Sequence, residues 1–226
     1  MKIIAAAAAA ALALLGFAGT AAAEEPVGDW IGKVTTPGGV ELTIAAHIRK
    51  GPDGGLEGYA ESPDQSTVTL AMAGVAAESD SLRFEMPLVR AKFAGRWDPA
   101  AGAWVGALTQ NGADMPLKLA RGLPPPRPVV AGLDGAWAGT IATPQGDLRI
   151  LLDVKTDAAG TLALFRSPDQ SPLPLVAQLS RKAEAVSFEL RGIGEFGGVL
   201  SADGQTLDGQ WRQGGGVIPL TLKKTP

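Results

Sequence analysis

The peptide Ser-Pro-Asp-Gln-Ser occurs twice in this sequence, at residues 62–66 and 167–171. Its aspartates, Asp64 and Asp169, are the acidic side chains of a repeated motif outside the expected strands, and paired carboxylates can do acid–base chemistry. The peptide also suits a turn, because proline presets the first central residue and aspartate can accept local backbone N–H bonds. We interpret it first as a turn closed within its own loop, and second as a ligand contact.

Two further glutamines, Gln110 and Gln213, share strand parity with apolar neighbours and are expected to point inward. A buried amide needs hydrogen bonds, which a nearby loop, a ligand or water would have to supply. The candidate ligand-binding residues are therefore these glutamines, the Asp-Gln of each repeated peptide, and a tryptophan near the start of each half of the chain. They are Trp30, Asp64, Gln65, Gln110, Trp137, Asp169, Gln170 and Gln213.

Groups that enzymes commonly use are sparse in this sequence. The one histidine, His47, lies on the polar side of an expected strand and has no counterpart in the second half, which favours an exposed surface side chain. The chain has no cysteine and no Gly-x-Ser-x-Gly, phosphate-loop or zinc-ligand pattern. We therefore expect a protein that is not an enzyme and that uses no metal or cofactor.

The first 23 residues have the pattern of a secretory signal peptide. Lys2 precedes an apolar run over residues 3–17, and Ala21 and Ala23 suit a signal peptidase. The run is short for a membrane span, so a membrane anchor is the weaker alternative. We expect cleavage after residue 23, a periplasmic or secreted location, and no stable membrane insertion afterwards. The acidic excess of the chain argues against nucleic acid as a partner.

The remaining chain repeats one pattern. "GDWIG" aligns with "GAWAG", "SLRFEM" with "AVSFEL", and "MPLKL" with "IPLTL", in the same order in both halves. Between the halves, "PPPRP" favours a stiff, extended spacer, with a proline-rich ligand for another domain as the alternative. The expected organisation is a signal peptide at 1–23, a first domain at 24–122, a linker at 123–133 and a second domain at 134–226.

Apolar and polar residues alternate along much of both halves, as expected of half-buried strands. Examples are residues 40–50, 89–97 and 148–154, and turn sequences such as "GPDGG" and "SADGQ" separate such segments. No segment after the signal peptide shows a convincing helical period. We predict an all-β chain of two tandem antiparallel up-and-down β-barrels with about eight strands each. A sandwich is the alternative, but closing a barrel removes exposed edges.

The combination of Gly-x-Trp-x-Gly, Ser-Pro-Asp-Gln, Phe-x-Gly and Pro-Leu in the last strand resembles a known family of domains. It is similar to the small β-domain that precedes the catalytic domain in some secreted bacterial α/β-hydrolases and serine-hydrolase-like proteins. The Gly-x-Trp start also resembles calycin-type barrels, the lipocalins and avidins, in which the tryptophan plugs one end. No catalytic domain follows here, so the resemblance implies tandem accessory barrels without inherited activity.

Three functions remain open from the sequence. The first is an exported binding or carrier protein for a small apolar ligand. The second is a pair of solid barrels that serve as a structural or interaction module and bind another envelope protein. The third is an accessory protein of a hydrolase system.

Overall fold

The computed structural model describes residues 24–144 and 146–226, so the expected signal peptide lies outside the described residues. Within the described ranges the chain consists of strands and turns, with one short 3-10 helix, η1 (Pro87–Val89). None of its helices, over the part described, is long and apolar enough to cross a bilayer. The all-β prediction is confirmed.

The first domain is a single antiparallel sheet that curls almost into a barrel. Its order is β4-β3-β2-β1-β9-β8-β7-β6-β5, and β4 and β5 are the two unpaired ends. A register shift between Ala73 and Ala76 in β5 interrupts pairing near this seam. The strands are β1 (Gly28–Thr35), β2 (Glu41–Lys50), β3 (Leu56–Glu61), β4 (Leu70–Ala71), β5 (Ala73–Glu78), β6 (Ser81–Met86), β7 (Ala91–Asp98), β8 (Ala103–Gln110) and β9 (Ala113–Arg121).

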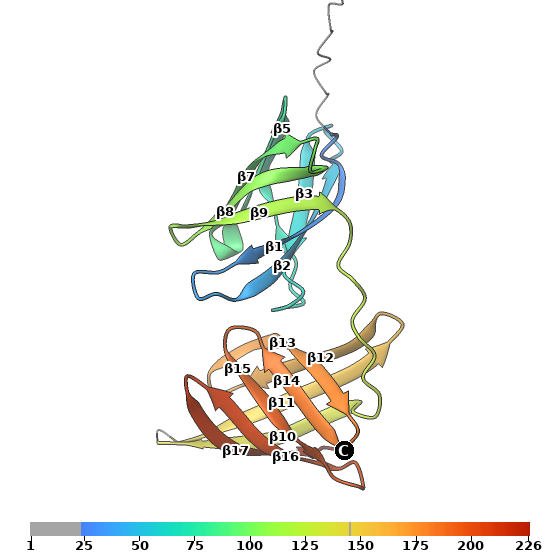
Figure 1. The fold of residues 1–226 in the computed structure, drawn as a ribbon, viewed down its shortest axis with the longest axis vertical. Coiled ribbons are helices and arrows are strands. Elements are labelled where there is room, and N and C mark those ends of the chain that lie inside the picture. The colour runs from blue at the N-terminus through green and yellow to red at the C-terminus, as the bar shows by residue number, and fades with distance from the viewer. Residues whose placement is uncertain (1–23, 145) are drawn as a thin grey trace, which may run out of the picture.

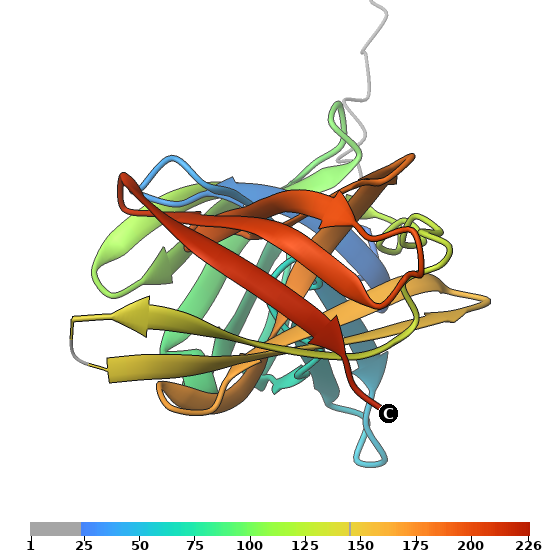
Figure 2. The same cartoon turned by 90° about the horizontal axis from the view of Figure 1, so that it is seen from below.

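The second domain is a closed eight-stranded barrel in which each strand pairs with its neighbours in sequence and β10 pairs with β17. In the view from below, this domain lies in front of the first (Figure 2). The prediction of two barrels is confirmed, with hydrogen-bonded closure in the second only. The strands are β10 (Gly135–Thr143), β11 (Gly146–Asp157), β12 (Gly160–Ser167), β13 (Ser171–Lys182), β14 (Ala185–Leu190), β15 (Gly194–Leu200), β16 (Thr206–Gln213) and β17 (Gly216–Lys224).

Alternating burial follows the sequence pattern in most strands. In β2, Leu42, Ile44 and Ile48 are all buried, and β11 buries alternate residues in the same way. One expected strand is shorter than predicted: β7 begins at Ala91, because the preceding residues form η1 and Arg90 takes a left-handed conformation with φ 50°.

Glycine allows the strands to coil tightly where they approach one another. A Cβ added to Gly106 in β8 would lie 2.0 Å from the carbonyl oxygen of Ala94 in β7. Its counterpart Gly209 would meet the carbonyl oxygen of Gly197 at 2.3 Å. Only glycine tolerates such contacts, so these positions fix how sharply each barrel can curve.

A buried tryptophan closes one end of each barrel. The indole Nε1 of Trp30 donates to the carbonyl of Pro26 at 2.7 Å, and that of Trp137 donates to Leu133 at 2.8 Å. A cation covers each ring, with the Arg121 guanidinium 4.4 Å from the Trp30 centroid. The segment before the first strand is therefore hydrogen-bonded to each tryptophan, and in the second domain its Leu133 is also part of the core.

The linker runs along one side of the molecule and joins the two domains, which are stacked along the long axis (Figure 1). Its second half is attached to the second barrel: Arg127 N donates to Ala159 O at 3.1 Å, and Thr161 N donates to Pro128 O at 3.0 Å. Leu133 is buried in the core of that barrel. The stretch from Arg127 onward thus belongs structurally to the second domain.

Candidate ligand-binding site

A cavity of about 610 Å³ lies in the second barrel at the end opposite Trp137. It opens among the hairpins that follow β10, β12, β14 and β16. Cavities of this size accommodate one small organic molecule. The residues that line it are Ile141, Thr143, Leu148, Ile150, Phe165, Ser167, Gln170, Ser171, Leu173, Leu175, Leu190, Ile193, Trp211, Gln213 and Ile218.

Two aromatic rings form part of the cavity wall. Phe165 and Trp211 stack with ring centroids 5.7 Å apart and an interplanar angle of 15°. In the repeat alignment their counterparts in the first barrel are Ala60 and Leu108. The second barrel therefore carries aromatic surface at an end where the first barrel has small or aliphatic side chains.

The first barrel concentrates its aromatic side chains at the other end. Trp30, Trp97 and Trp104 form an edge-to-face cluster with centroids 5.3–6.1 Å apart. The counterparts of Trp97 and Trp104 in the second barrel are Leu200 and Leu207. The large aromatic side chains therefore lie at opposite ends of the two barrels, next to Trp30 in the first and away from Trp137 in the second.

The repeated peptide contributes a polar group to the cavity. Ser167 is 7% exposed, and its buried hydroxyl has no hydrogen-bond partner among the described residues. The counterpart hydroxyl of Ser62 donates to Gln65 Oε1 at 3.1 Å. A buried hydroxyl without a partner costs about 1–3 kcal/mol. Such a group inside a cavity indicates a place for a ligand atom or a water molecule.

Of the sequence candidates, Gln170 and Gln213 both line this cavity, but both are exposed, so Gln213 is not the inward-pointing buried amide that the sequence predicted. Gln213 Oε1 accepts from Trp211 Nε1 at 3.0 Å, which holds the amide beside the aromatic wall. Gln110 instead donates to the Val89 carbonyl at 2.9 Å and ties β8 to η1. Gln65 lies in the interdomain contact, where its carbonyl accepts from Val176 N at 2.9 Å.

The two aspartates hold neighbouring strands, which corrects the expectation that each caps its own loop. Asp64 Oδ2 accepts from Thr43 N in β2 at 2.6 Å, and Asp169 Oδ2 accepts from Arg149 N in β11 at 2.7 Å. Backbone bonds close the turns themselves, such as Gln65 N to Ser62 O at 3.0 Å. The proline-led turn places each carboxylate within reach of the adjacent strand.

Beyond this shared bond the aspartates differ. The Arg149 guanidinium pairs with Asp169 at 2.7 Å and lowers the pKa of that carboxyl. Asp64 Oδ1 accepts from Gln178 Nε2 of the second domain at 3.1 Å. One copy of the motif therefore serves its own barrel alone, and the other also joins the two domains.

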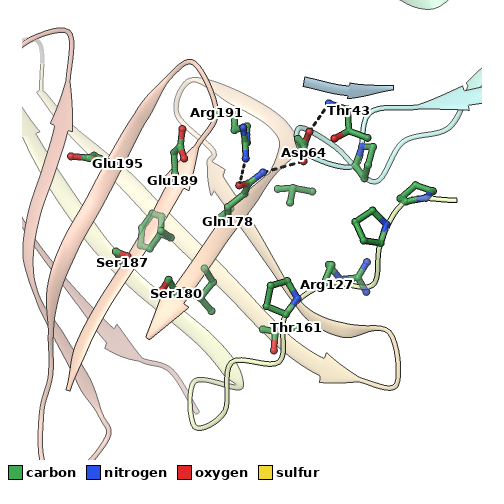
Figure 3. Close-up of a pocket in the computed structure, with 18 of the residues that line it drawn as sticks. Thr43, Asp64, Arg127, Thr161, Gln178, Ser180, Ser187, Glu189, Arg191 and Glu195 are labelled. Carbon is green, nitrogen blue, oxygen red and sulfur yellow. Dashed lines mark hydrogen bonds between the residues drawn. The ribbon is translucent and has the colours of Figure 1, made fainter. Parts of the chain in front are cut away.

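Asp64 borders a second hollow of about 510 Å³ that lies between the linker and strands β13, β14 and β15, with core residues such as Phe188 in its lining. In Figure 3 a chain of hydrogen bonds runs from Thr43 through Asp64 and Gln178 to Arg191. Arg191 Nη1 also donates to Glu41 O at 3.2 Å. These polar groups largely bond to one another, so their main effect is to fasten the domains.

The interdomain contact uses an edge that β14 leaves uncovered. β13 has 12 residues and β14 has 6, and their pairing begins at Gln178. Val176, just before that point, finds its acceptor in Gln65 of the first domain. The first copy of the repeated loop thus caps part of this exposed edge.

His47 differs from its expected exposed setting. Its side chain is 12% exposed, its Nδ1 lies 2.7 Å from Asp29 Oδ1, and its ring stacks on Tyr59 at 4.5 Å. Nε2 lies 3.3 Å from Glu61 Oε1. Cross-strand neighbours therefore enclose the imidazole on the outer face of the first domain. The described residues include no cluster of three or more His, Cys, Asp or Glu side chains suited to a metal ion.

Trp30 and Trp137, the remaining sequence candidates, are core plugs with 0% and 1% exposure. Phe165 was not among the residues expected at a site, and Ser167 was considered only as part of the repeated peptide. The available signal was the exchange of Ala60 for Phe165 and of Leu108 for Trp211 between otherwise matching segments.

No protein-family model matches the chain, and a search of curated proteins finds no match. Among solved structures, a protein of unknown function from the DUF3598 family of Nostoc punctiforme is 13% identical, with 88% of this chain and 96% of that chain covered and a TM-score of 0.28. The isotype 1 transferrin binding protein B of serogroup B Neisseria meningitidis is 12% identical, with 84% and 53% covered and a TM-score of 0.25. This chain spans about half of the latter's length.

Proposed function

We propose that the chain is an exported, non-catalytic binding protein whose second barrel holds one small, largely apolar molecule. The observation that most directly supports this proposal is the cavity of about 610 Å³ bounded by Phe165 and Trp211. Most of its lining is aliphatic or aromatic, with a few polar groups at fixed positions, which is typical of small-molecule sites. The first barrel supports the second by docking against β13 through the carbonyl of Gln65.

Export is the second part of the proposal and rests on the sequence of residues 1–23. N-terminal sequencing of the protein recovered from the cell envelope should show Glu24 as the first residue. Retention of Met1 would contradict export by signal-peptide cleavage.

The binding proposal can be tested with N-phenyl-1-naphthylamine, an uncharged apolar dye whose fluorescence rises in apolar surroundings. The full chain should bind one dye per molecule. Leu148→Trp places a large ring in the cavity from a partly buried position and should weaken dye binding at least about tenfold, equivalent to about 1.4 kcal/mol. Val199→Trp is the matched control, because Val199 is 54% exposed on the same barrel and does not line the cavity.

Circular dichroism and melting curves establish that both variants fold. Unchanged dye affinity in a folded Leu148→Trp protein would contradict the cavity as the binding site. Equal losses in both variants would point to a general effect on the barrel instead.

A further inference from the structure

We infer that the ligand of the second barrel is an uncharged molecule with a hydrogen-bond-accepting oxygen, and that Ser167 and Gln213 select for it. This inference rests on the proposed function, because it assigns a chemical class to the molecule in that cavity. Two independent features support it. The described lining of the cavity carries no charged side chain, and some of its hydrogen-bonding groups have no partner within the described protein.

The polar side chains that line the cavity are all neutral: Thr143, Ser167, Gln170, Ser171 and Gln213. Arg149 in β11 and Asp169 in the loop after β12 pair with each other at 2.7 Å, and neither lines the cavity. A carboxylate, phosphate or ammonium in the cavity would lose its hydration without gaining a counter-charge, which is strongly unfavourable. The lining therefore favours a neutral ligand.

Several of these polar groups are already occupied. The Thr143 hydroxyl donates to Gly146 O at 2.7 Å, and Ser171 Oγ accepts from Leu173 N at 3.2 Å. Gln213 Oε1 accepts from Trp211 Nε1, so the part of that amide left for a ligand is its NH₂ group, which only donates.

Ser167 adds a hydroxyl, which can donate as well as accept, so the donor-only NH₂ group of Gln213 is what favours an accepting oxygen. Its hydroxyl is buried and has no partner in the described part of the chain, although its counterpart Ser62 is bonded within its loop. A ligand oxygen that accepts from Ser167 would satisfy the hydroxyl. The ligand class is accordingly a neutral alcohol, ketone, ester or ether with an apolar body.

Three ligands of equal chain length separate the possibilities: decan-1-ol, decanoate and decylammonium. Each is titrated at neutral pH against the complex of the full chain with N-phenyl-1-naphthylamine, which has no oxygen atom to accept from Ser167 or Gln213. We expect decan-1-ol to displace the dye at a concentration at least about tenfold lower than either ion does.

Ser167→Ala should weaken decan-1-ol binding about five- to tenfold, as for the loss of one hydrogen bond, and should weaken dye binding less than it weakens alcohol binding. Ser167→Thr, which keeps a hydroxyl, should restore much of the preference for the alcohol. Ser62→Ala is the matched control in the first copy of the same peptide and should change neither affinity.

The outcomes distinguish the two proposals. The ligand class is wrong, and the binding function stands, if the dye binds but decanoate or decylammonium displaces it at the same concentration as decan-1-ol does. The same conclusion follows if Ser167→Ala leaves alcohol binding unchanged. If the wild-type chain binds neither the dye nor any of the three ligands, the proposed function itself is overturned, and the ligand class with it.

Discussion

Replacing Asp64 by alanine should loosen the first barrel and its contact with the second domain at the same time. The carboxylate accepts from Thr43 N at 2.6 Å within the first barrel. It also accepts from Gln178 Nε2 across the interface at 3.1 Å. Both bonds disappear in Asp64→Ala, and the partly buried amide of Thr43 is left without its acceptor.

The expected magnitude follows from these two bonds. A charge-assisted bond to a backbone amide contributes about 1.5–3 kcal/mol, and the bond to Gln178 contributes about 0.5–1.5 kcal/mol. Because Asp64 is only half-buried, water replaces part of this loss. We expect the free energy of unfolding to fall by about 2–3 kcal/mol in total.

A double-mutant cycle with Gln178→Ala isolates the interdomain part. Urea unfolding followed by tryptophan fluorescence and circular dichroism would give the free energies of the single and double variants. The coupling between Asp64 and Gln178 should be about 0.5–1 kcal/mol. Asp169→Ala combined with Gln178→Ala is the control, and its effects should be additive. Additive effects for Asp64 and Gln178, or an Asp64→Ala protein as stable as wild type, would refute the assigned roles.

Two further predictions concern the second barrel. Trp137→Ala empties a fully buried site and removes the bond to Leu133, so unfolding in urea should show a loss of about 3–5 kcal/mol, while Val199→Ala should change little; a small loss for Trp137→Ala would contradict its role as a plug. Because Arg149 lowers the pKa of Asp169 below its ordinary 3.8, this ion pair should contribute stability above that pH and lose it as the pH falls through the lowered pKa. The difference in melting temperature between wild type and Asp169→Asn should therefore shrink on acidification below about pH 4, and a difference that stays constant with pH would exclude the linkage.

The sequence predicted the architecture well because barrel strands obey a local rule. Alternation places Leu42, Ile44 and Ile48 on one side of β2 whatever the neighbouring strands are. The repeat then required two such domains. What alternation cannot specify is how the first sheet ends: β4 and β5, the two ends of its order, are separated in the chain by Met72 alone, and the register shifts where β5 pairs with β6.

The site was less accessible to sequence reasoning because its members meet only through strand register. Asp64 was expected to accept hydrogen bonds within its own loop. It instead accepts from the backbone N–H of Thr43 in β2, about twenty residues earlier in the chain. His47 is enclosed by side chains from β1 and β3. The cavity draws on distant strands for Phe165 and Trp211, and packing in three dimensions decides whether their combined volume fills the barrel.

The turn after β14 has two neighbours at once. Leu190 and Ile193 line the cavity, and Arg191 between them reaches Glu41 of the first domain. A molecule that shifts this turn on binding would also shift the guanidinium that fastens the domains. Thermodynamic linkage makes the effect reciprocal. If the ligand changes the equilibrium constant for domain docking by some factor, docking changes the affinity of the cavity for the ligand by the same factor. A partner that separates the domains would therefore change ligand affinity by that factor. The effect of the ligand on domain docking and the effect of domain docking on ligand affinity would then report the same coupling free energy.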